Sequence, residues 1–179
     1  TTISVPDKPS GRGRVLTPSI VAEWSQAHGI PCLKPIHSDE LKGQIENLDL
    51  VITIGYGVIL PQRILSLPKF GFINLHFSLL PHYRGAAPVQ RSLLNGDTTT
   101  GVTVFALDKG MDTGAIYVSQ VCEIDPTWRT SELLEVLSQM RPKVLEKSCA
   151  KILSNEIPKI QSGESSLAPK VTVEEALLD

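Results

Sequence analysis

The pattern of apolar and polar positions predicts alternating strands and helices along this chain. Residues 49–55, DLVITIG, contain a continuous β-branched run bounded by turn residues, and residues 71–75, GFINL, form a second, shorter and mainly apolar run. The first run is typical of a strand that is buried on both faces of a parallel sheet. The connection between the two runs has helical length, as parallel neighbouring strands require. The pattern therefore predicts an α/β fold with a mostly parallel sheet flanked by helices.

The remaining pattern adds elements on both sides of these two strands. They are, in chain order, a strand at 2–5, a helix at 18–28 after an N-cap at Thr17, a helix at 88–95, strands at 101–107 and 115–124, and a long helix capped by Thr130 or Ser131. From residue 155 onward the chain is polar and contains prolines, which is typical of a linker. We therefore predict one folded domain over residues 1–154 and a linker over residues 155–179.

Composition and charge exclude several classes of protein. The chain has 179 residues, enough for one substantial core, and a formal net charge of −2, which gives no overall attraction to nucleic acid. Its three cysteines are widely spaced and form no CxxC pair, which argues against a zinc knuckle and against a disulfide framework. No apolar run reaches the length of a membrane span. The sequence pattern also contains no cluster of metal ligands.

A locally basic loop follows the first predicted strand. Residues 6–16, PDKPSGRGRVL, combine turn-forming residues with the cations Lys8, Arg12 and Arg14. A short, flexible, cationic loop can contact a phosphate backbone, because such contacts need charge more than fixed geometry. An ordinary solvated surface loop has a similar composition, and the pattern alone leaves both interpretations open.

Residues 71–91, GFINLHFSLLPHYRGAAPVQR, contain the strongest candidate for a functional site. Asn74 and His76 lie two positions apart at the end of a strand, so both side chains leave the same face. An irregular loop rich in proline and glycine follows, and then the N-terminus of a helix. Open α/β sheets bind their ligands at such strand ends. The alternative interpretation is a structural polar pair at the strand end.

A glycine-rich turn after residues 101–107 supplies two candidate carboxylates, Asp108 and Asp112. Aspartates in such turns commonly accept hydrogen bonds from nearby backbone N–H groups and so stabilise the turn. Either aspartate could also face His76, and spacing alone does not distinguish them. The chain has neither a dinucleotide-binding fingerprint nor a phosphate-binding loop motif, so the pattern indicates no nucleotide cofactor.

Two stretches, NLHFSLLPHYRGAAPVQ at 74–90 and GDTTTGVTVFALDKGMDTG at 96–114, resemble the folate-dependent formyltransferases. That family shares an Asn-x-His-x-Ser-Leu-Leu-Pro motif and a later Asp-x-Gly turn. Within it the chain is most similar to the methionyl-tRNA formyltransferases, through PDKPSGRGRVLTPS, RGAAPVQRSLLNGDTTTGVT and LAPKVTVEEALLD. The resemblance implies a Rossmann-like domain that transfers the formyl group of 10-formyltetrahydrofolate to the amino group of initiator methionyl-tRNA, for translation initiation.

The resemblance also implies roles for individual residues. Asn74, His76 and Asp112 match the family's catalytic trio, which selects Asp112 from the two aspartates. Arg12 matches an arginine of the loop that the family places against the tRNA acceptor arm, and we expect Arg14 to contact tRNA as well. Folate contacts are implied by the family motif and by equivalent pocket positions at Ser78, Leu79, Leu80, Pro81, Ile59, Leu60, Leu107 and Met111. The implied mechanism needs no metal.

The same resemblance sets expectations for the whole chain. We expect it to lack the family's first strand–helix unit and the C-terminal β-barrel domain. We expect a monomer without membrane association, located in the mitochondrial matrix or a plastid if the source is eukaryotic, and otherwise in the bacterial cytoplasm. The alternatives are a related formyltransferase acting on a sugar nucleotide or glycinamide ribonucleotide, a formyl-folate hydrolase, or an inactive fragment that binds folate or RNA.

Overall fold

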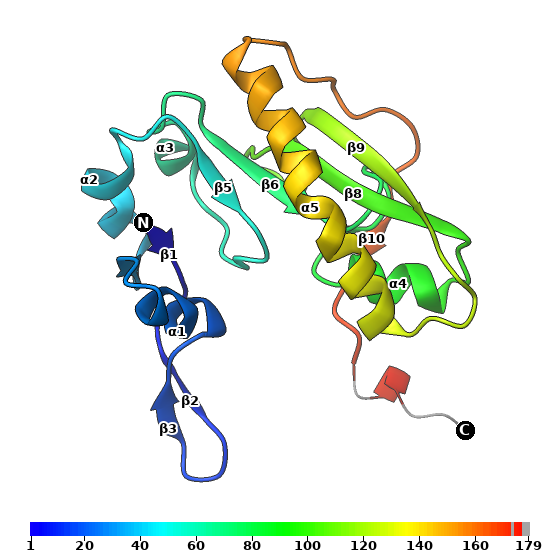
Figure 1. Ribbon diagram of the computed structural model, residues 1–179, viewed down its shortest axis with the longest axis horizontal. Helices are drawn as coiled ribbons and strands as arrows, with labels where there is room; N and C mark the ends of the chain where they lie inside the picture. The colour runs from blue at the N-terminus through cyan, green and yellow to red at the C-terminus, as the bar shows by residue number, and fades with distance from the viewer. Residues whose placement is uncertain (173, 177–179) are drawn as a thin grey trace.

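A four-stranded mixed sheet forms the centre of the protein, with its strands in the order β5-β6-β8-β9 (Figure 1). β5 (Val51–Thr53) and β6 (Phe72–His76) run parallel, and β8 (Thr99–Ala106) runs antiparallel to both β6 and β9 (Ile116–Glu123). The computed structural model describes residues 1–172 and 174–176. The predicted α/β class is confirmed, but this sheet is mixed rather than mostly parallel, because β8 and β9 form a hairpin.

The long helix α5 (Thr130–Leu153) covers one face of the sheet (Figure 1). Together they form the main core from almost fully buried side chains of β6, β8 and α5: Ile73, Leu75, Val102, Val104, Leu133, Leu137 and Val144. Burial of each such side chain stabilises the fold by about 1.5–3 kcal/mol. The N-cap of α5 is Arg129, one residue before Thr130 and two before Ser131, the predicted caps, and its N–H donates to the Glu132 carboxylate over 3.0 Å.

Alternation along β6 sends the remaining side chains to the opposite face of the sheet. Phe72 packs there in a second apolar cluster that includes Leu41, Ile45 and Ile64. These partners come from three short helical segments, η1 (Ser38–Leu41), α2 (Lys42–Ile45) and α3 (Gln62–Leu65). Since side chains two apart in a strand share a face, Asn74 and His76 leave β6 on this side as predicted.

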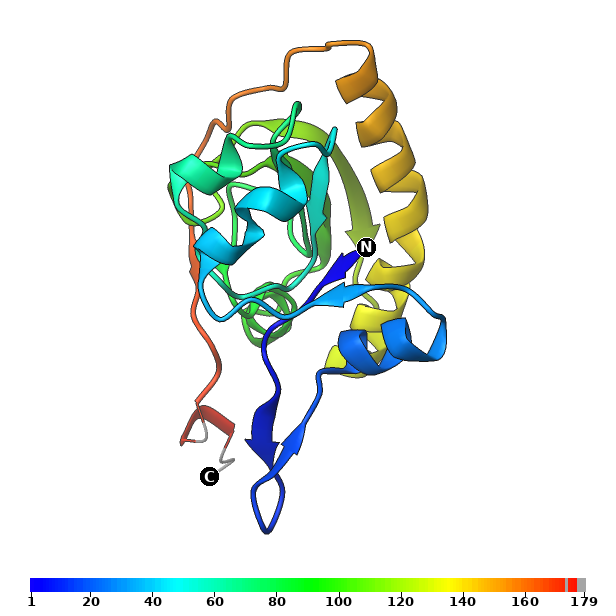
Figure 2. The same cartoon turned by 90° about the vertical axis from the view of Figure 1, so that its left-hand side faces the viewer.

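The N-terminal region forms a small unit beside this sheet (Figures 1 and 2). β1 (Thr2–Ile3) pairs in parallel with β4 (Cys32–Leu33), and helix α1 (Ile20–Ala27) contacts both strands. The N-cap of α1 is Ser19, two residues after the predicted cap, and its hydroxyl accepts the Ala22 N–H over 3.1 Å. The strand predicted at residues 2–5 is therefore present but shorter, and its partner is β4 rather than the central sheet.

The predicted basic loop is an ordered β-hairpin. β2 (Lys8–Ser10) pairs antiparallel with β3 (Val15–Thr17), and residues 11–14 form the turn at its tip. The hairpin projects from the rest of the molecule with all of its side chains from Lys8 to Leu16 exposed (Figure 2). Its cations are therefore free to meet a partner in solution.

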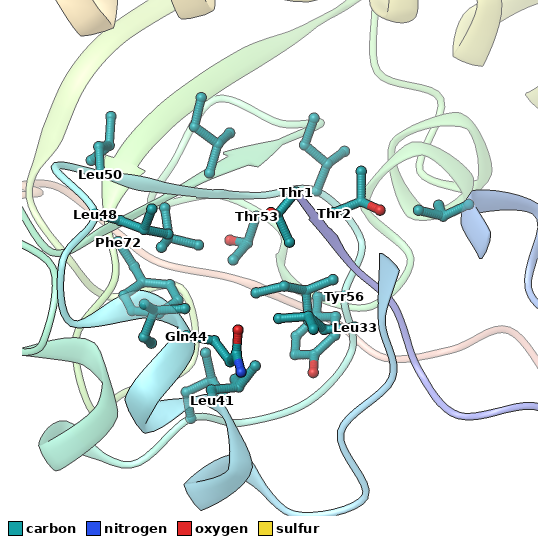
Figure 3. Close-up of a pocket in the computed structure, with 17 residues that line it drawn as sticks. Thr1, Thr2, Leu33, Leu41, Gln44, Leu48, Leu50, Thr53, Tyr56 and Phe72 are labelled. Carbon is teal, nitrogen blue, oxygen red and sulfur yellow. The ribbon is translucent and has the colours of Figure 1, made fainter. Parts of the chain in front are cut away.

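A cavity of about 500 Å³ with a mainly apolar lining lies between β1 and β5. Thr1 and Thr2 line it from the β1 side, and Thr53 and Tyr56 from the β5 side (Figure 3). Within the described residues β5 pairs along one edge only, with β6. Ile52 of β5 is 44% exposed, so the prediction of a strand buried on both faces is wrong. An edge strand has no second neighbour whose side chains would cover its own.

Candidate active site

His76 lies at the end of β6 with 6% of its surface exposed. Its Nε2 atom is 2.7 Å from the Tyr83 carbonyl oxygen. A carbonyl oxygen only accepts hydrogen bonds, so Nε2 carries a proton and donates it to Tyr83. This contact leaves Nδ1 as the ring nitrogen that faces the remaining polar groups of the site.

Asp112 approaches that second nitrogen from the turn after β8. Its Oδ2 atom lies 3.8 Å from His76 Nδ1, and it also accepts the Gly85 N–H over 2.8 Å. The separation from His76 is longer than a direct hydrogen bond, so Nδ1 stays open to exchange a proton with a bound molecule. When Nδ1 is protonated, the carboxylate stabilises the positive charge of the ring.

The structure distinguishes the two aspartates that spacing left open. Asp108 Oδ1 accepts hydrogen bonds from the Gly110 N–H over 2.9 Å and from the Thr113 hydroxyl over 2.6 Å. Asp108 therefore stabilises the turn, and Asp112 is the aspartate that faces His76. The choice made from the family resemblance agrees with this geometry.

Asn74 is the polar residue of the site without a protein partner. Its Oδ1 atom is buried and makes no hydrogen bond to any residue that the structure describes. Leaving such an atom unpaired costs about 1–3 kcal/mol, which a bound molecule with a matching polar group would recover. The carboxamide therefore fits a ligand-binding role better than a structural one.

The loop after β6 is shaped by a buried hydrogen-bond network centred on Thr103 of β8. The Thr103 hydroxyl donates to the Ser78 carbonyl over 2.7 Å and accepts the Leu80 N–H over 3.3 Å. The Ser78 hydroxyl in turn donates to the His82 carbonyl over 2.6 Å. These bonds fold the loop back so that Tyr83 can reach His76.

The predicted folate contacts fall into different environments. Ser78, Leu80 and Pro81 are buried inside the loop, and Leu79 is half-buried. Leu60 and Leu107 share the apolar cluster around Phe72. Ile59 and Met111 are mostly exposed, at 84% and 52%. The eight residues therefore differ in burial, and their contact with folate stays a prediction.

The two predicted tRNA contacts lie apart from the predicted catalytic trio. Arg12 and Arg14 are exposed at the tip of the β2–β3 hairpin, which extends away from the sheet (Figure 2). Asp7, the acidic residue nearest to these cations in sequence, pairs instead with Lys34 over 2.6 Å. The hairpin tip therefore keeps its positive charge.

Sequence reasoning missed several residues that shape the site. The sequence predicts no role for Tyr83, and Gln161 and Ser166 fall within the predicted linker at 155–179. In the structure Gln161 donates to the Asp112 carbonyl, and Ser166 accepts the Tyr83 N–H. Residues 173 and 177–179 of that predicted linker lie outside the described residues. No local sequence signal marks these contacts, because the partners lie 49 and 83 residues apart.

Across residues 1–172 and 174–176, no group of three or more His, Cys, Asp or Glu side chains could hold a metal ion. No helix in the same part of the chain has the length and apolarity needed to cross a membrane.

Comparison with known proteins gives consistent matches. The model of the formyl transferase family matches residues 1–149. A methionyl-tRNA formyltransferase from Geobacter sulfurreducens is 37% identical over 183 residues, covering 99% of this chain and 58% of its own length. This chain therefore spans less than two thirds of that relative.

Solved structures share the fold at lower identity. HypX from Aquifex aeolicus, in complex with tetrahydrofolic acid, has a TM-score of 0.73 at 16% identity, covering 84% of this chain and 26% of that one. The formyltransferase PseJ from Anoxybacillus kamchatkensis, in complex with a UDP-sugar and tetrahydrofolate, has a TM-score of 0.67 at 23% identity. The match covers 94% of this chain and 86% of that one. These likenesses confirm the Rossmann-like α/β class.

Proposed function

Because this chain belongs to the formyl transferase family, we propose that it transfers the formyl group of 10-formyltetrahydrofolate to the amino group of methionine on initiator methionyl-tRNA. The observation that carries the proposal is that Asp112 lies 3.8 Å from His76 at the end of β6, while Asn74 leaves the same face of that strand. The acceptor is chosen from the 37% identity to a methionyl-tRNA formyltransferase, whose similarity extends along almost the whole of this chain.

The chemistry requires the side chains that meet at this site. The acceptor amine adds to the formyl carbon, a tetrahedral centre with a negative oxygen forms, and the bond from that carbon to the folate nitrogen then breaks. The Asn74 amide can donate a hydrogen bond to the negative oxygen without carrying charge itself. His76 can move a proton from the attacking nitrogen to the leaving nitrogen through Nδ1. Asp112 stabilises the imidazolium that forms between these steps.

The projecting hairpin supports a nucleic-acid acceptor. Its tip holds Arg12 and Arg14 in exposed positions, and no acidic residue lies between Lys8 and Thr17. Phosphate contacts depend on such accessible positive charge, and the binding affinity that they provide falls as the salt concentration rises. A cationic arm outside the catalytic centre suits a large polyanionic acceptor better than a small one.

Formylation by the purified chain tests the proposal. The chain is mixed with 10-formyltetrahydrofolate and either initiator methionyl-tRNA, an amino-sugar nucleotide or glycinamide ribonucleotide, and formyl transfer and folate release are measured separately. We expect transfer to methionyl-tRNA. Transfer to one of the other acceptors would show that the proposed acceptor is wrong. Folate release without transfer would indicate a hydrolase. Folate binding without either reaction would indicate an inactive binding fragment.

A further inference from the structure

After α5 the chain returns past the start of β9 toward β10 (Leu167–Ala168) (Figure 1). On the way, Gln161 and Ser166 contact the loops of the candidate active site. We call residues 159–168 of this segment the C-terminal strap. At one end of the strap, Lys159 and Ile116 of β9 exchange backbone hydrogen bonds of 2.7 and 2.8 Å. At the other end, β10 pairs in parallel with β7 (Arg84–Gly85). The strap is thus fixed at both ends to elements that flank the site.

The Gln161 carboxamide joins the two loops that carry the site. Its Nε2 group donates to the carbonyl oxygens of Asp112 and Gly114, over 2.9 and 2.8 Å. Its Oε1 atom accepts from the Arg84 guanidinium, from Nε over 3.2 Å and from Nη2 over 2.6 Å. A glutamine amide has two donor hydrogens and two acceptor lone pairs, so its full hydrogen-bonding capacity is used here.

Ser166 holds the residue whose carbonyl contacts His76. Its hydroxyl accepts the Tyr83 N–H over 2.9 Å, and its carbonyl accepts the Arg84 N–H over 2.9 Å. The Tyr83 side chain is anchored separately, because its hydroxyl donates to Asp97 over 2.6 Å and accepts from Asn95 over 2.8 Å. Tyr83 is therefore held through both its backbone and its ring.

Two residues of the site have backbone conformations that need such support. Tyr83 has φ 60° and Asp112 has φ 54°, in the left-handed region that residues other than glycine rarely adopt. These conformations cost free energy and persist only where the surroundings hold them. The strap contacts both residues, through Ser166 and Gln161 respectively.

The strap also lies too close to the site loop to tolerate a larger residue there. Gly85 has φ 121°, and a Cβ atom added to it would come within 2.9 Å of the Ala168 carbonyl oxygen. The N–H of the same glycine donates to Asp112. One residue thus connects the strap, the loop and the catalytic carboxylate.

We propose that Gln161 and Ser166 are positioning residues for formyl transfer: Gln161 fixes Asp112 against His76, and Ser166 fixes the Tyr83 carbonyl that orients the imidazole. The inference rests on the proposed function for its effect on turnover, and on the geometry alone for its effect on the loops. A displacement of about 1 Å at reacting groups can reduce turnover about 10²-fold. We therefore expect Gln161→Ala and Ser166→Ala to lower kcat by about 10-fold to 10²-fold, with smaller changes in KM.

Conservative variants separate positioning from packing. Gln161→Glu keeps the size of the side chain and its acceptors for Arg84 but removes both donors to the Asp112 turn, so it should lose turnover as Gln161→Ala does. Ser166→Thr keeps the hydroxyl and should retain turnover. Ser162→Ala and Ser165→Ala are matched controls at exposed neighbouring positions of the strap and should behave like the unchanged protein.

Amide hydrogen exchange provides a readout that does not depend on activity. Gln161→Ala should increase exchange at Gly85 and at residues 112–114 by at least about 10-fold, while the amides of β8 keep the exchange of the unchanged protein. Ser166→Ala should increase exchange at Tyr83. In each variant the ¹⁵N signals of the His76 ring should shift, because its hydrogen-bond partner or its facing carboxylate has moved.

The outcomes separate this inference from the proposed function. If the unchanged chain transfers no formyl group, the proposed function fails, and exchange and the His76 signals alone decide the inference. If Gln161→Ala and Ser166→Ala leave turnover, exchange and the His76 signals as in the controls, the inference is wrong. A variant that loses turnover with uniformly faster exchange throughout β8 has lost its fold, and that result also contradicts a positioning role.

Discussion

At the scale of single residues, the site depends on which nitrogen of His76 is free. The Tyr83 carbonyl oxygen accepts a hydrogen bond from the Nε2–H group, and Asp112 lies 3.8 Å from Nδ1. The imidazole is thereby oriented by one neutral and one charged partner. Burial raises the pKa of the Tyr83 hydroxyl, and its hydrogen bond to Asp97 raises that pKa further, so the ring stays neutral while it anchors the loop.

The first prediction concerns His76 itself. His76→Ala removes the proton carrier and should reduce formylation by at least about 10²–10³-fold, and Asn74→Ala should reduce it by about the same factor through loss of the oxyanion donor. Steady-state kinetics of the purified variants measure both effects. His28→Ala, at an exposed position beside Trp24, is the control and should keep normal turnover. Near-normal formylation by His76→Ala would rule out the assigned site.

The second prediction uses the two aspartates as a matched pair. Asp112→Asn keeps the shape of the side chain but removes the charge that stabilises protonated His76, so turnover should fall about 10²-fold. Asp108→Asn keeps an acceptor for the Gly110 N–H and should change turnover little. Comparison of kcat for the two variants checks the assignment. Equal losses would mean that the turn as a whole, rather than the Asp112 charge, supports the reaction.

The sequence predicted only part of this site. The alternation of side chains along a strand predicted that Asn74 and His76 share one face, because this alternation is a local property of the strand. The position of Asp112 came from family resemblance, since spacing allowed Asp108 as well. Tyr83, Gln161 and Ser166 were missed because they act through backbone atoms or through partners distant in the sequence.

At the scale of elements, periodicity predicted most helices and strands but failed where burial depends on neighbours. The helix α1 has apolar residues at helical spacing, yet Ile20 and Trp24 are exposed and its buried residues are Ala22 and Ser25. β5 likewise has the amino-acid composition of a central strand, but it lies at the edge of the described sheet. A pattern shows which face of an element is apolar, and only the fold shows what covers it.

The third prediction concerns the β2–β3 hairpin. Arg12→Ala and Arg14→Ala should each weaken tRNA binding and lower the salt dependence of that binding by about one phosphate contact, while folate affinity stays unchanged. Binding to tRNA measured over a series of salt concentrations, beside folate binding, checks both parts. Arg63→Ala on α3, where the guanidinium already pairs with Asp39, is the control cation. Unchanged salt dependence in both hairpin variants would exclude the hairpin from the tRNA interface.

At the scale of the whole molecule, the open edge of β5 and the cavity beside it leave strand hydrogen-bonding groups and apolar side chains accessible. Such edges pair readily with another chain. The α/β class was predictable from the pattern. The combination of parallel and antiparallel strands was not predictable from it, because the direction of a strand relative to its neighbours depends on long-range pairing.

The fourth prediction follows from this edge. Although the family resemblance implies a monomer, the unchanged protein should associate increasingly as its concentration rises, which light scattering during size-exclusion chromatography measures. Ile52→Lys places a charge on the edge strand and should reduce this association. Ile157→Lys makes the same change at another exposed isoleucine and should not reduce it. A monomer at every concentration would show that the edge is protected.

The strap has a consequence for the order in which the protein becomes competent during synthesis. Chains emerge from the ribosome N-terminus first, so His76 and Asp112 are made long before Gln161 and Ser166. The sheet and α5 can pack as soon as residue 153 has emerged. The two loops acquire their final partners only when residues 161–168 follow, so a nascent chain would hold a finished core for some time before the loops around His76 reach their final positions.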